Sequence, residues 1–306
     1  MTGPFLVHQA LIYRDAQQFL AAVLPFITEG LGRGEPVLAV ATEANCGLLR
    51  DELGKYAADV QFVEPTRWYD SPGRALATCH RYVHERRNGH NQVRVVGEPT
   101  WAGLDPLETA GWKRFEASLN IALAAAPAWL LCSYDERVVA PGVIADARRT
   151  HPELSGGGKS AEYSNPAGFC SELQTPLEPA PEGSYAALNF DGDPAPVRRF
   201  VVAEAARLGL PIGCLDDLIL AVNEVATNAI RHGAGSGRVQ VWRDERYLIC
   251  EVFDAGQATE GLFNMVPPRP DSEGGHGMWI TRQLCDLVEI RSLPNGTTIR
   301  LYTRYS

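Results

Sequence analysis

The sequence predicts two domains of different fold class: an α/β N-terminal domain with a mainly parallel sheet, then an α+β C-terminal domain built as a two-layer sandwich. The chain has 306 residues, which at about 100–200 residues per domain favours two domains. A segment with three prolines in six residues, which no continuous helix can contain, interrupts the chain near residue 180. The order of helices and strands also changes there. We therefore predict a domain at residues 1–174, a linker at 175–184 and a domain at 185–306.

Before the linker, short apolar segments typical of buried strands alternate with amphipathic helices. The predicted strands are 37–41, 60–63, 93–96 and 129–133. The predicted helices are 15–31, 72–88 and 107–125. Continuous apolar strands separated by helices indicate a mainly parallel sheet that is covered on both faces.

After the linker, a strand is followed by two helices and then by strands that alternate apolar and polar residues. The predicted elements are a strand at 185–190, helices at 194–208 and 215–231, strands at 238–242 and 247–253, a short helix, and strands at 288–292 and 297–303. The polar turn at 243–246 predicts an antiparallel hairpin with one covered face.

The composition disfavours several classes of protein. The formal net charge is −9, whereas a nucleic-acid-binding domain normally has a basic face. The N-terminus lacks the features of a signal peptide, and the longest nearly apolar run has about 12 residues, against about 20 for a membrane span. The seven cysteines are irregularly spaced and match neither a disulfide framework nor a zinc site. We therefore expect a cytoplasmic protein with reduced thiols, no membrane contact and no direct nucleic-acid partner.

The second helix of the C-terminal domain has two distinct faces. Its apolar residues step by four, three and four, which predicts a buried stripe of Leu218, Val222, Val225 and Ala229. On another face Glu224, Asn228 and His232 step by four, so their polar ends can converge on one ligand. A solvated polar face is the alternative for these three residues. For His232, before Gly233, a helix C-cap is favoured over a catalytic role.

Two glycine motifs follow this helix. Asp254 ends a strand, with Gly256 two residues later, so its carboxylate can meet an amine-bearing ring while the backbone approaches closely. The segment Gly274-Gly-His-Gly-Met278 then opens a helix, where free N–H groups and the positive end of a helix dipole suit phosphates.

In this order, the motifs of residues 185–306 resemble the N, G1 and G2 boxes of the GHKL (Bergerat-fold, HATPase) ATPases, above all the anti-sigma-factor serine kinases of bacterial stress and sporulation pathways. The resemblance implies ATP and Mg²⁺ as cofactors. It implies that Asn228 coordinates the Mg²⁺, that Glu224 is the catalytic general base, and that Asp254 takes the adenine amino group with support from Thr298. The glycines expected to shape the adenine pocket and the phosphate lid are Gly256, Gly274, Gly275 and Gly277.

One departure from that pattern concerns the G1 box, where Gln257 stands in place of a further glycine that many relatives carry. The lid also contains a Pro-Pro-Arg-Pro run at 267–270. The region from Asp254 to Gly277 contains no lysine, so Mg²⁺, backbone N–H groups and Arg269 are expected to meet the phosphate charge.

The N-terminal domain resembles the MEDS sensory domain, a RecA/KaiC-like module, over about residues 5–170. The resemblance rests on His8 and Tyr13 with the segment 26–38, on the segment 131–135 and on the segment 147–153. It implies that the domain senses a signal without identifying that signal.

Three further features of this domain contain residue types that can form ligand sites. The segment 155–160 (Ser-Gly-Gly-Gly-Lys-Ser) imitates part of a Walker A loop, but Glu153 stands where the first glycine belongs, and a flexible loop is the better interpretation. Cys79, His80 and His84 share a predicted helix, but no third ligand at a recognised spacing accompanies them, which favours incidental histidines on a surface helix. For His8, a sensing role and a structural hydrogen bond remain equally open.

Together the two resemblances imply a signal-responsive anti-sigma regulator. The resemblance implies that it phosphorylates a Ser or Thr of a STAS-type anti-anti-sigma partner, or sequesters a sigma factor, and related kinases often form homodimers. The alternative is an ATP-binding partner switch without turnover. A two-component histidine kinase is disfavoured, because the segment before the ATPase-like domain is proline-rich and contains no histidine.

Overall fold

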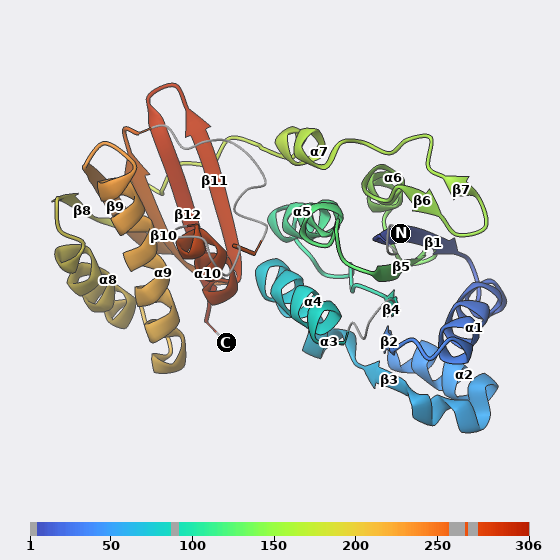
Figure 1. Cartoon of the computed structure of the whole chain (residues 1–306). Coiled ribbons are helices and arrows are strands. Elements are labelled where there is room, and N and C mark those ends of the chain that lie inside the picture. Colours follow the sequence, from blue (N-terminus) through green and yellow to red (C-terminus); the bar gives the residue numbers. More distant parts are fainter. Residues whose placement is uncertain (1–4, 87–91, 257–266, 269–274, 306) are drawn as a thin grey trace. The chain divides into compact units, whose positions relative to one another are not determined.

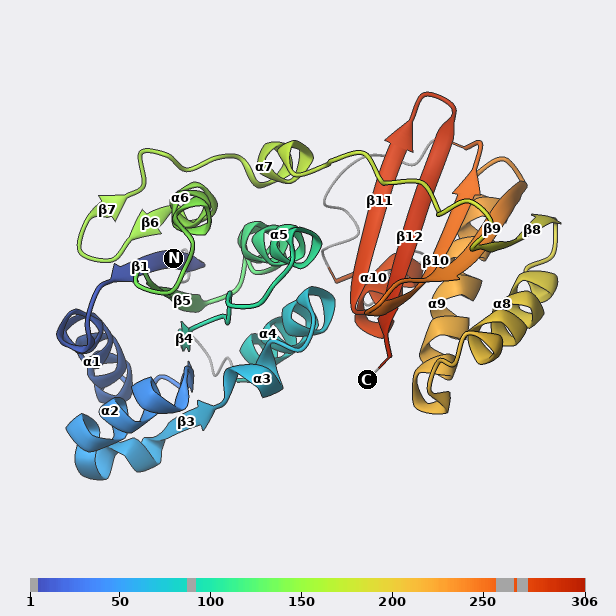
Figure 2. The same cartoon turned by 180° about the vertical axis from the view of Figure 1, so that it is seen from behind.

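The computed structural model describes residues 5–86, 92–256, 267–268 and 275–305. The chain divides into two compact units, one made of residues 1–70 and 75–173 and the other of residues 71–74 and 174–306. Figures 1 and 2 show the helices and strands of each unit from opposite sides.

The N-terminal unit is built on a seven-stranded sheet with the order β3-β2-β4-β5-β1-β6-β7. All of its strand pairs are parallel except β6 with β7, so the predicted mainly parallel sheet is confirmed. The strands are β1 (Val7–Tyr13), β2 (Val37–Val40), β3 (Val60–Val63), β4 (Val93–Gly97), β5 (Ala128–Asp135), β6 (Glu153–Leu154) and β7 (Gly158–Lys159). The helices are α1 (Ala16–Gly32), α2 (Glu43–Leu53), the 3₁₀ helix η1 (Gly54–Asp59), α3 (Pro65–Trp68), α4 (Pro72–Arg86), α5 (Pro106–Ala122), α6 (Pro141–Thr150) and α7 (Pro166–Glu172).

Helices cover this sheet on both faces because successive side chains of each strand point to opposite sides. Leu11, Tyr13 and Leu131 pack in one apolar cluster with residues of α1 and α2. Their neighbours along the same strands, including Ala10 and Cys132, pack in another cluster with residues of α6. The two central strands therefore carry one set of side chains toward each layer of helices.

Two of the motifs noted in the sequence of this unit form common structural elements, one a hairpin turn and the other part of a helix. The Walker-like segment forms the turn of the β6–β7 hairpin, with Gly156 and Gly158 at positive φ. On α4, Cys79 is buried, and the partly buried rings of His80 and His84 stack with centroids 3.9 Å apart.

The C-terminal unit is a five-stranded antiparallel sheet, order β11-β12-β10-β9-β8, with helices packed against it (Figure 1). This confirms the predicted α+β arrangement. The strands are β8 (Ala186–Asp191), β9 (Ser236–Arg243), β10 (Tyr247–Asp254), β11 (Leu287–Leu293) and β12 (Gly296–Arg304). The helices are α8 (Ala195–Arg207), α9 (Ile212–Arg231) and α10 (His276–Leu284). One apolar cluster joins α8, α9 and α10 to β9, β10, β11 and β12, and it contains the predicted stripe of α9.

The start of the proline-rich segment is fastened to the sheet of the C-terminal unit. The buried guanidinium groups of Arg291 and Arg300 donate hydrogen bonds to the backbone carbonyls of Thr175 and Glu178, at 2.7 and 2.8 Å. Arg300 also forms an ion pair with Glu251 on the neighbouring strand. Residues 175–178 thus lie along β11 and β12, whereas the sequence predicted only an extended linker here.

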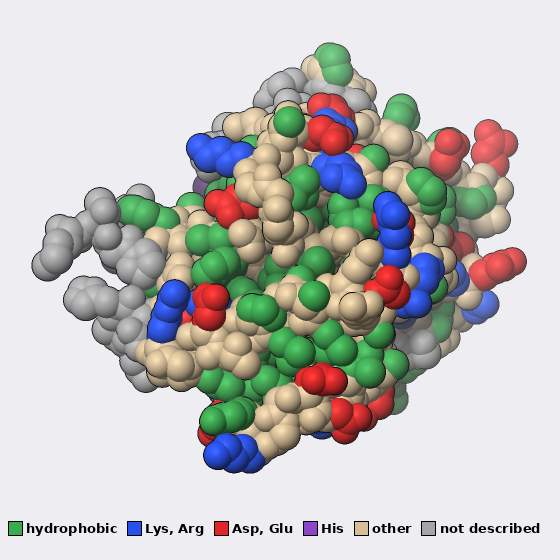
Figure 3. Space-filling model, turned by 90° about the vertical axis from the view of Figure 1, so that its right-hand side faces the viewer, with side chains coloured by type: hydrophobic (Ala, Val, Ile, Leu, Met, Phe, Trp, Pro, Cys, Tyr) green, Lys and Arg blue, Asp and Glu red, His purple; other side chains and the backbone are tan. Residues whose placement is uncertain are grey.

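The distribution of surface charge and the length of the helices bear on whether the protein could bind nucleic acid or cross a membrane. On the face shown in Figure 3, the described acidic and basic side chains lie intermixed and are not gathered by sign. That face lacks the continuous basic surface that binds a phosphate backbone. None of the helices in the described ranges combines the length and the apolar character needed to cross a membrane.

Candidate functional site

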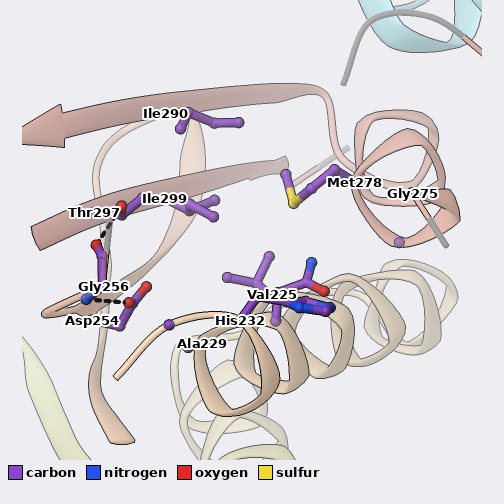
Figure 4. Close-up of a pocket in the computed structure, with 13 residues that line it drawn as sticks. Val225, Ala229, His232, Asp254, Gly256, Gly275, Met278, Ile290, Thr297 and Ile299 are labelled. Carbon is purple, nitrogen blue, oxygen red and sulfur yellow. Dashed lines mark hydrogen bonds between the residues drawn. The ribbon is translucent and has the colours of Figure 1, made fainter. Parts of the chain in front are cut away.

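The candidate site in the C-terminal unit is a pocket of about 440 Å³ between the sheet and helices α9 and α10 (Figure 4). This volume is within the range of about 300–1,000 Å³ that is typical of small-molecule sites. The residues that line the pocket are Val225, Asn228, Ala229, His232, Gly233, Asp254, Gly256, Gly275, Gly277, Met278, Ile290, Thr297 and Ile299. None of the described residues that line the pocket is Lys or Arg, so their side chains supply no fixed positive charge.

Helix α9 supplies one wall of the pocket. The residues of its predicted stripe are buried in the core, which fixes the rotation of the helix. Asn228 and His232, one turn apart, then face the pocket. His232 is also the C-cap of α9, and its backbone N–H donates to the Asn228 carbonyl at 2.8 Å, as predicted. Two of the three residues of the polar face therefore meet at one cavity.

Asp254 stands at the end of β10 with its carboxylate at the pocket. Its side chain is 8% exposed, and its Oδ1 atom accepts a hydrogen bond from the Gly256 backbone N–H at 2.7 Å (Figure 4). Burial raises the pKa of Asp254, and hydrogen bonds from the backbone N–H groups of Gly256 and Ala234 partly offset that rise. A carboxylate held in this way presents its second oxygen as an acceptor for a donor inside the pocket.

Two glycines make room for this carboxylate. A methyl group on Gly256 would lie 2.7 Å from Asp254 Oδ1 and would overlap the Cα atom of Gly233. A methyl group on Gly233 would in turn overlap Asp254 Oδ1 and lie 2.6 Å from the Ala229 carbonyl oxygen. The turn after β10 and the end of α9 thus pack so closely that neither glycine has room for a side chain. We call this contact the interlock of the two glycines. Gly256 was predicted from the sequence, whereas Gly233 was noted only as the residue after a helix cap.

The N-terminus of α10 meets α9 on the other side of the pocket. Gly275 is the N-cap and has φ 86°, a left-handed conformation that favours glycine. A methyl group on Gly277 would lie 2.7 Å from Glu224 Oε2 and 3.5 Å from Asn228 Nδ2. The side chains of Glu224 and Asn228 therefore lie beside the first turn of α10, whose free N–H groups carry the positive end of the helix dipole.

The threonine that lines the pocket is Thr297, and the predicted Thr298 is not among the described lining residues. Thr297 is 2% exposed, pairs with Asp254 across β10 and β12, and donates its hydroxyl to the Gly256 carbonyl at 2.9 Å. Because side chains alternate along a strand, Thr298 points to the opposite face of the sheet. Ile299, two residues after Thr297, lines the pocket beside it (Figure 4).

The sequence also left the apolar wall of the pocket unassigned. Met278, Ile290 and Ile299 face Val225 and Ala229 across the cavity (Figure 4). Apolar residues in strands and helices look like ordinary core, so only the tertiary structure shows that these border a cavity. Gly274, Gln257 and Arg269, which the sequence analysis singled out, lie outside the described residues.

Substituting Gly256 with alanine tests the interlock of the two glycines. We expect Gly256→Ala to lower the free energy of unfolding by about 1–2 kcal/mol, because the new methyl group meets backbone atoms that cannot rotate away. Urea denaturation measures this change. The matched control is Gly213→Ala in α9, where a methyl group meets nothing within 4 Å and alanine raises helix propensity by up to about 1 kcal/mol. Equal stability of the two variants would contradict the interlock.

Comparisons with known proteins agree with this division of the chain. The model of the MEDS (methanogen/methylotroph, DcmR sensory) domain family matches residues 7–152, and that of the histidine kinase-like ATPase domain matches residues 192–303. The serine-protein kinase RsbW of Bacillus velezensis is 31% identical over 123 residues, which cover 36% of this chain and 76% of that protein. RsbW of Bacillus subtilis is 29% identical over the same length, with the same coverage.

A solved structure, that of the RsbU and RsbW domains of Rv1364c from Mycobacterium tuberculosis, is 21% identical with a TM-score of 0.30. The match covers 39% of this chain and about a third (32%) of that one. The RsbW match and the two domain matches together establish the family. The chain belongs to the RsbW family of serine-protein kinases and joins a histidine kinase-like ATPase domain to an N-terminal MEDS sensory domain.

Proposed function

We propose that the protein is a signal-responsive anti-sigma regulator whose C-terminal domain binds Mg-ATP and phosphorylates a Ser or Thr of a STAS-type anti-anti-sigma partner, or sequesters a sigma factor. One observation carries the proposal. Asn228, Asp254, Gly256, Gly275 and Gly277 are distant in sequence but line a single pocket. Membership of the RsbW family supports the regulatory and kinase roles.

The shape and chemistry of the pocket fit a nucleotide. Its apolar wall suits the two faces of an adenine ring, and the Asp254 carboxylate can accept a hydrogen bond from the exocyclic amine. Thr297, in place of Thr298, is the threonine that supports this end of the site. At the other end, the bare backbone at Gly275 and Gly277 and the N-terminus of α10 suit phosphate oxygens.

The residues beside α10 also fit a magnesium ion. The Asn228 amide oxygen is a hard donor of the kind that Mg²⁺ prefers, and phosphate oxygens normally complete such a site. The ion would neutralise the phosphate charge that the described lining residues, none of which is Lys or Arg, leave unmet. Glu224, next to Gly277, would take the proton from the attacking Ser or Thr hydroxyl of the partner.

Calorimetric titration of the full chain with ATP, followed by phosphotransfer to candidate STAS proteins, tests the proposal. We expect binding that weakens about tenfold or more when EDTA removes Mg²⁺, because the described lining residues include no Lys or Arg that could replace the ion. We also expect label to move from [γ-³²P]ATP to a Ser or Thr of the partner. Absence of ATP binding would refute the proposal. Binding and nucleotide-dependent partner capture without transfer would support the alternative, a partner switch without turnover.

A further inference from the structure

Four potential metal ligands converge in the core of the N-terminal unit: His8 on β1, Cys132 on β5, Glu116 on α5 and His151 directly after α6. One ligand atom from each lies within 4.8 Å of all the others. Every one of these residues is buried, with exposed fractions of 1%, 5%, 2% and 0% in that order. The cluster belongs to a different unit from the nucleotide pocket and plays no part in the proposed kinase reaction.

The topology of the sheet explains how the four side chains meet. Strands β1 and β5 are parallel neighbours, and Ala10 pairs with Cys132. His8, two residues before Ala10, therefore points to the same face of the sheet as Cys132. On that face the side chain of Glu116 comes down from α5, and His151 is the C-cap of α6. Ligands from four separate elements thus point to one place.

Outer hydrogen bonds orient both imidazole rings toward the centre of the cluster. His8 Nδ1 lies 3.0 Å from Asn120 Oδ1, and His151 Nδ1 lies 2.7 Å from the carbonyl oxygen of Ala147. Asn120 is itself fixed by a hydrogen bond from its amide to the Thr150 carbonyl at 2.8 Å. Because each acceptor oxygen requires a proton on Nδ1, the lone pair of each Nε2 atom faces inward, as in metal-binding histidines.

Three of the inward-facing atoms lack the hydrogen bonds that buried polar groups normally make. Among the residues that the structure describes, neither carboxylate oxygen of Glu116, nor His151 Nε2, has a hydrogen-bond partner. Glu116 Oε2 lies 3.6 Å from His8 Nε2 and 3.5 Å from His151 Nε2. Burial of polar atoms without partners is costly. A bound cation would satisfy all of them together.

Three of the six separations between these atoms match those of ligands around one ion, and all six are within 4.8 Å. Bonds of 2.0–2.3 Å in a tetrahedral zinc site place neighbouring ligand atoms about 3.3–3.8 Å apart. His8 Nε2 lies 3.4 Å from Cys132 Sγ, and the two approaches to Glu116 Oε2 are within the same range. A papain-like nucleophile is disfavoured for Cys132, because that residue is buried in the described part of the chain.

We propose that His8, Glu116, Cys132 and His151 bind a divalent transition-metal ion, with zinc the best match. Two imidazoles, one carboxylate and one thiolate form the mixed N, O and S donor set that zinc accepts. Binding would release the Cys132 thiol proton to solvent, and the two negative ligands would then balance the charge of the ion. With four protein ligands and no open position, the site would fasten β1, β5, α5 and α6 together as a structural centre.

Metal analysis of the full-length protein tests this site directly. We expect about one zinc ion per chain after dialysis against zinc and then metal-free buffer. With cobalt(II) in its place, we expect the visible bands of tetrahedral cobalt and a thiolate-to-cobalt charge-transfer band in the near ultraviolet. His8→Gln and Cys132→Ser should each weaken binding about 100-fold or more, and Cys132→Ser should abolish the charge-transfer band.

Matched controls are available in the same unit. Cys46→Ser removes another buried thiol and His84→Gln another histidine, both outside the cluster, and neither should change the affinity by more than about twofold. A wild-type chain without stoichiometric metal, or control variants that lose as much affinity as the ligand variants, would overturn the proposal.

Should the ligand variants fail to fold, X-ray absorption of the zinc-loaded wild type tests the ligand set directly. One sulfur and three nitrogen or oxygen neighbours support the site, and any other set refutes it.

Discussion

Replacing Glu224 with glutamine is expected to lower the rate of phosphotransfer about 10²–10⁴-fold, the usual range for loss of a positioned general base. Glutamine keeps the size and hydrogen-bonding geometry of the side chain but cannot take a proton at neutral pH. The affinity for ATP should stay within about threefold, because Glu224 is not among the residues that line the nucleotide pocket.

This separation of binding from turnover follows from where Glu224 lies. Its carboxylate is next to Gly277, in the first turn of α10, at the end of the pocket proposed for the phosphates. Asp254, proposed to hold the base, is on β10 with its partner Thr297 across the strand pair. A change of charge at Glu224 should therefore affect the reacting end of the site and leave adenine recognition intact.

Single-turnover transfer from [γ-³²P]ATP to a STAS partner measures the rate, and calorimetry measures the affinity. The control is Asp216→Asn, which removes an exposed carboxylate from the same helix away from the pocket. A Glu224→Gln variant that transfers phosphate as fast as wild type would refute the catalytic role. A parallel fall in ATP affinity would show instead that Glu224 contributes to nucleotide binding.

Much of the fold could be predicted because its signals are local. The apolar stripe of α9 and the alternation in β9 and β10 depend on residues a few positions apart, and the structure confirms those elements. Strand β1 was not predicted as a strand, although it lies inside the parallel sheet. Its sequence contains His8 and Gln9, whose partners Asn120, Glu153 and Trp129 are more than 100 residues away. Local pattern cannot show that such polar residues are satisfied in a core.

The place of Thr297 and the burial of Glu116 could not be predicted from the sequence for the same reason. Thr297 and Thr298 are adjacent and chemically identical, and only the pairing of β12 with β10 decides which one faces Asp254. Glu116 looks like a solvated residue of an amphipathic helix, yet it is buried against two histidines. By contrast, Asp254 and Gly256 could be predicted, because a carboxylate at a strand end and a glycine two residues later form a motif within one short segment.

Replacing Asp254 with asparagine is expected to weaken ATP binding about 10–100-fold, the cost of losing a hydrogen bond to a charged acceptor in a shielded site. The fold should persist, because the asparagine Oδ1 can still accept the hydrogen bond from the Gly256 N–H. Glycine packing around the side chain is also unchanged, since asparagine and aspartate have nearly the same shape. Calorimetry gives the affinity, and thermal unfolding of the unliganded protein checks the stability.

A second nucleotide shows whether the binding energy lost in Asp254→Asn comes from the hydrogen bond to the adenine amino group. Purine riboside triphosphate lacks that amino group, so the wild-type protein should bind it about 10–100-fold more weakly than ATP. In Asp254→Asn this discrimination should nearly vanish, because the carboxylate and the amine contribute through one shared hydrogen bond and their losses are not additive. If the variant still prefers ATP over purine riboside triphosphate as strongly as wild type does, Asp254 does not recognise the adenine amino group. The drop in affinity would then reflect a change in the shape of the pocket.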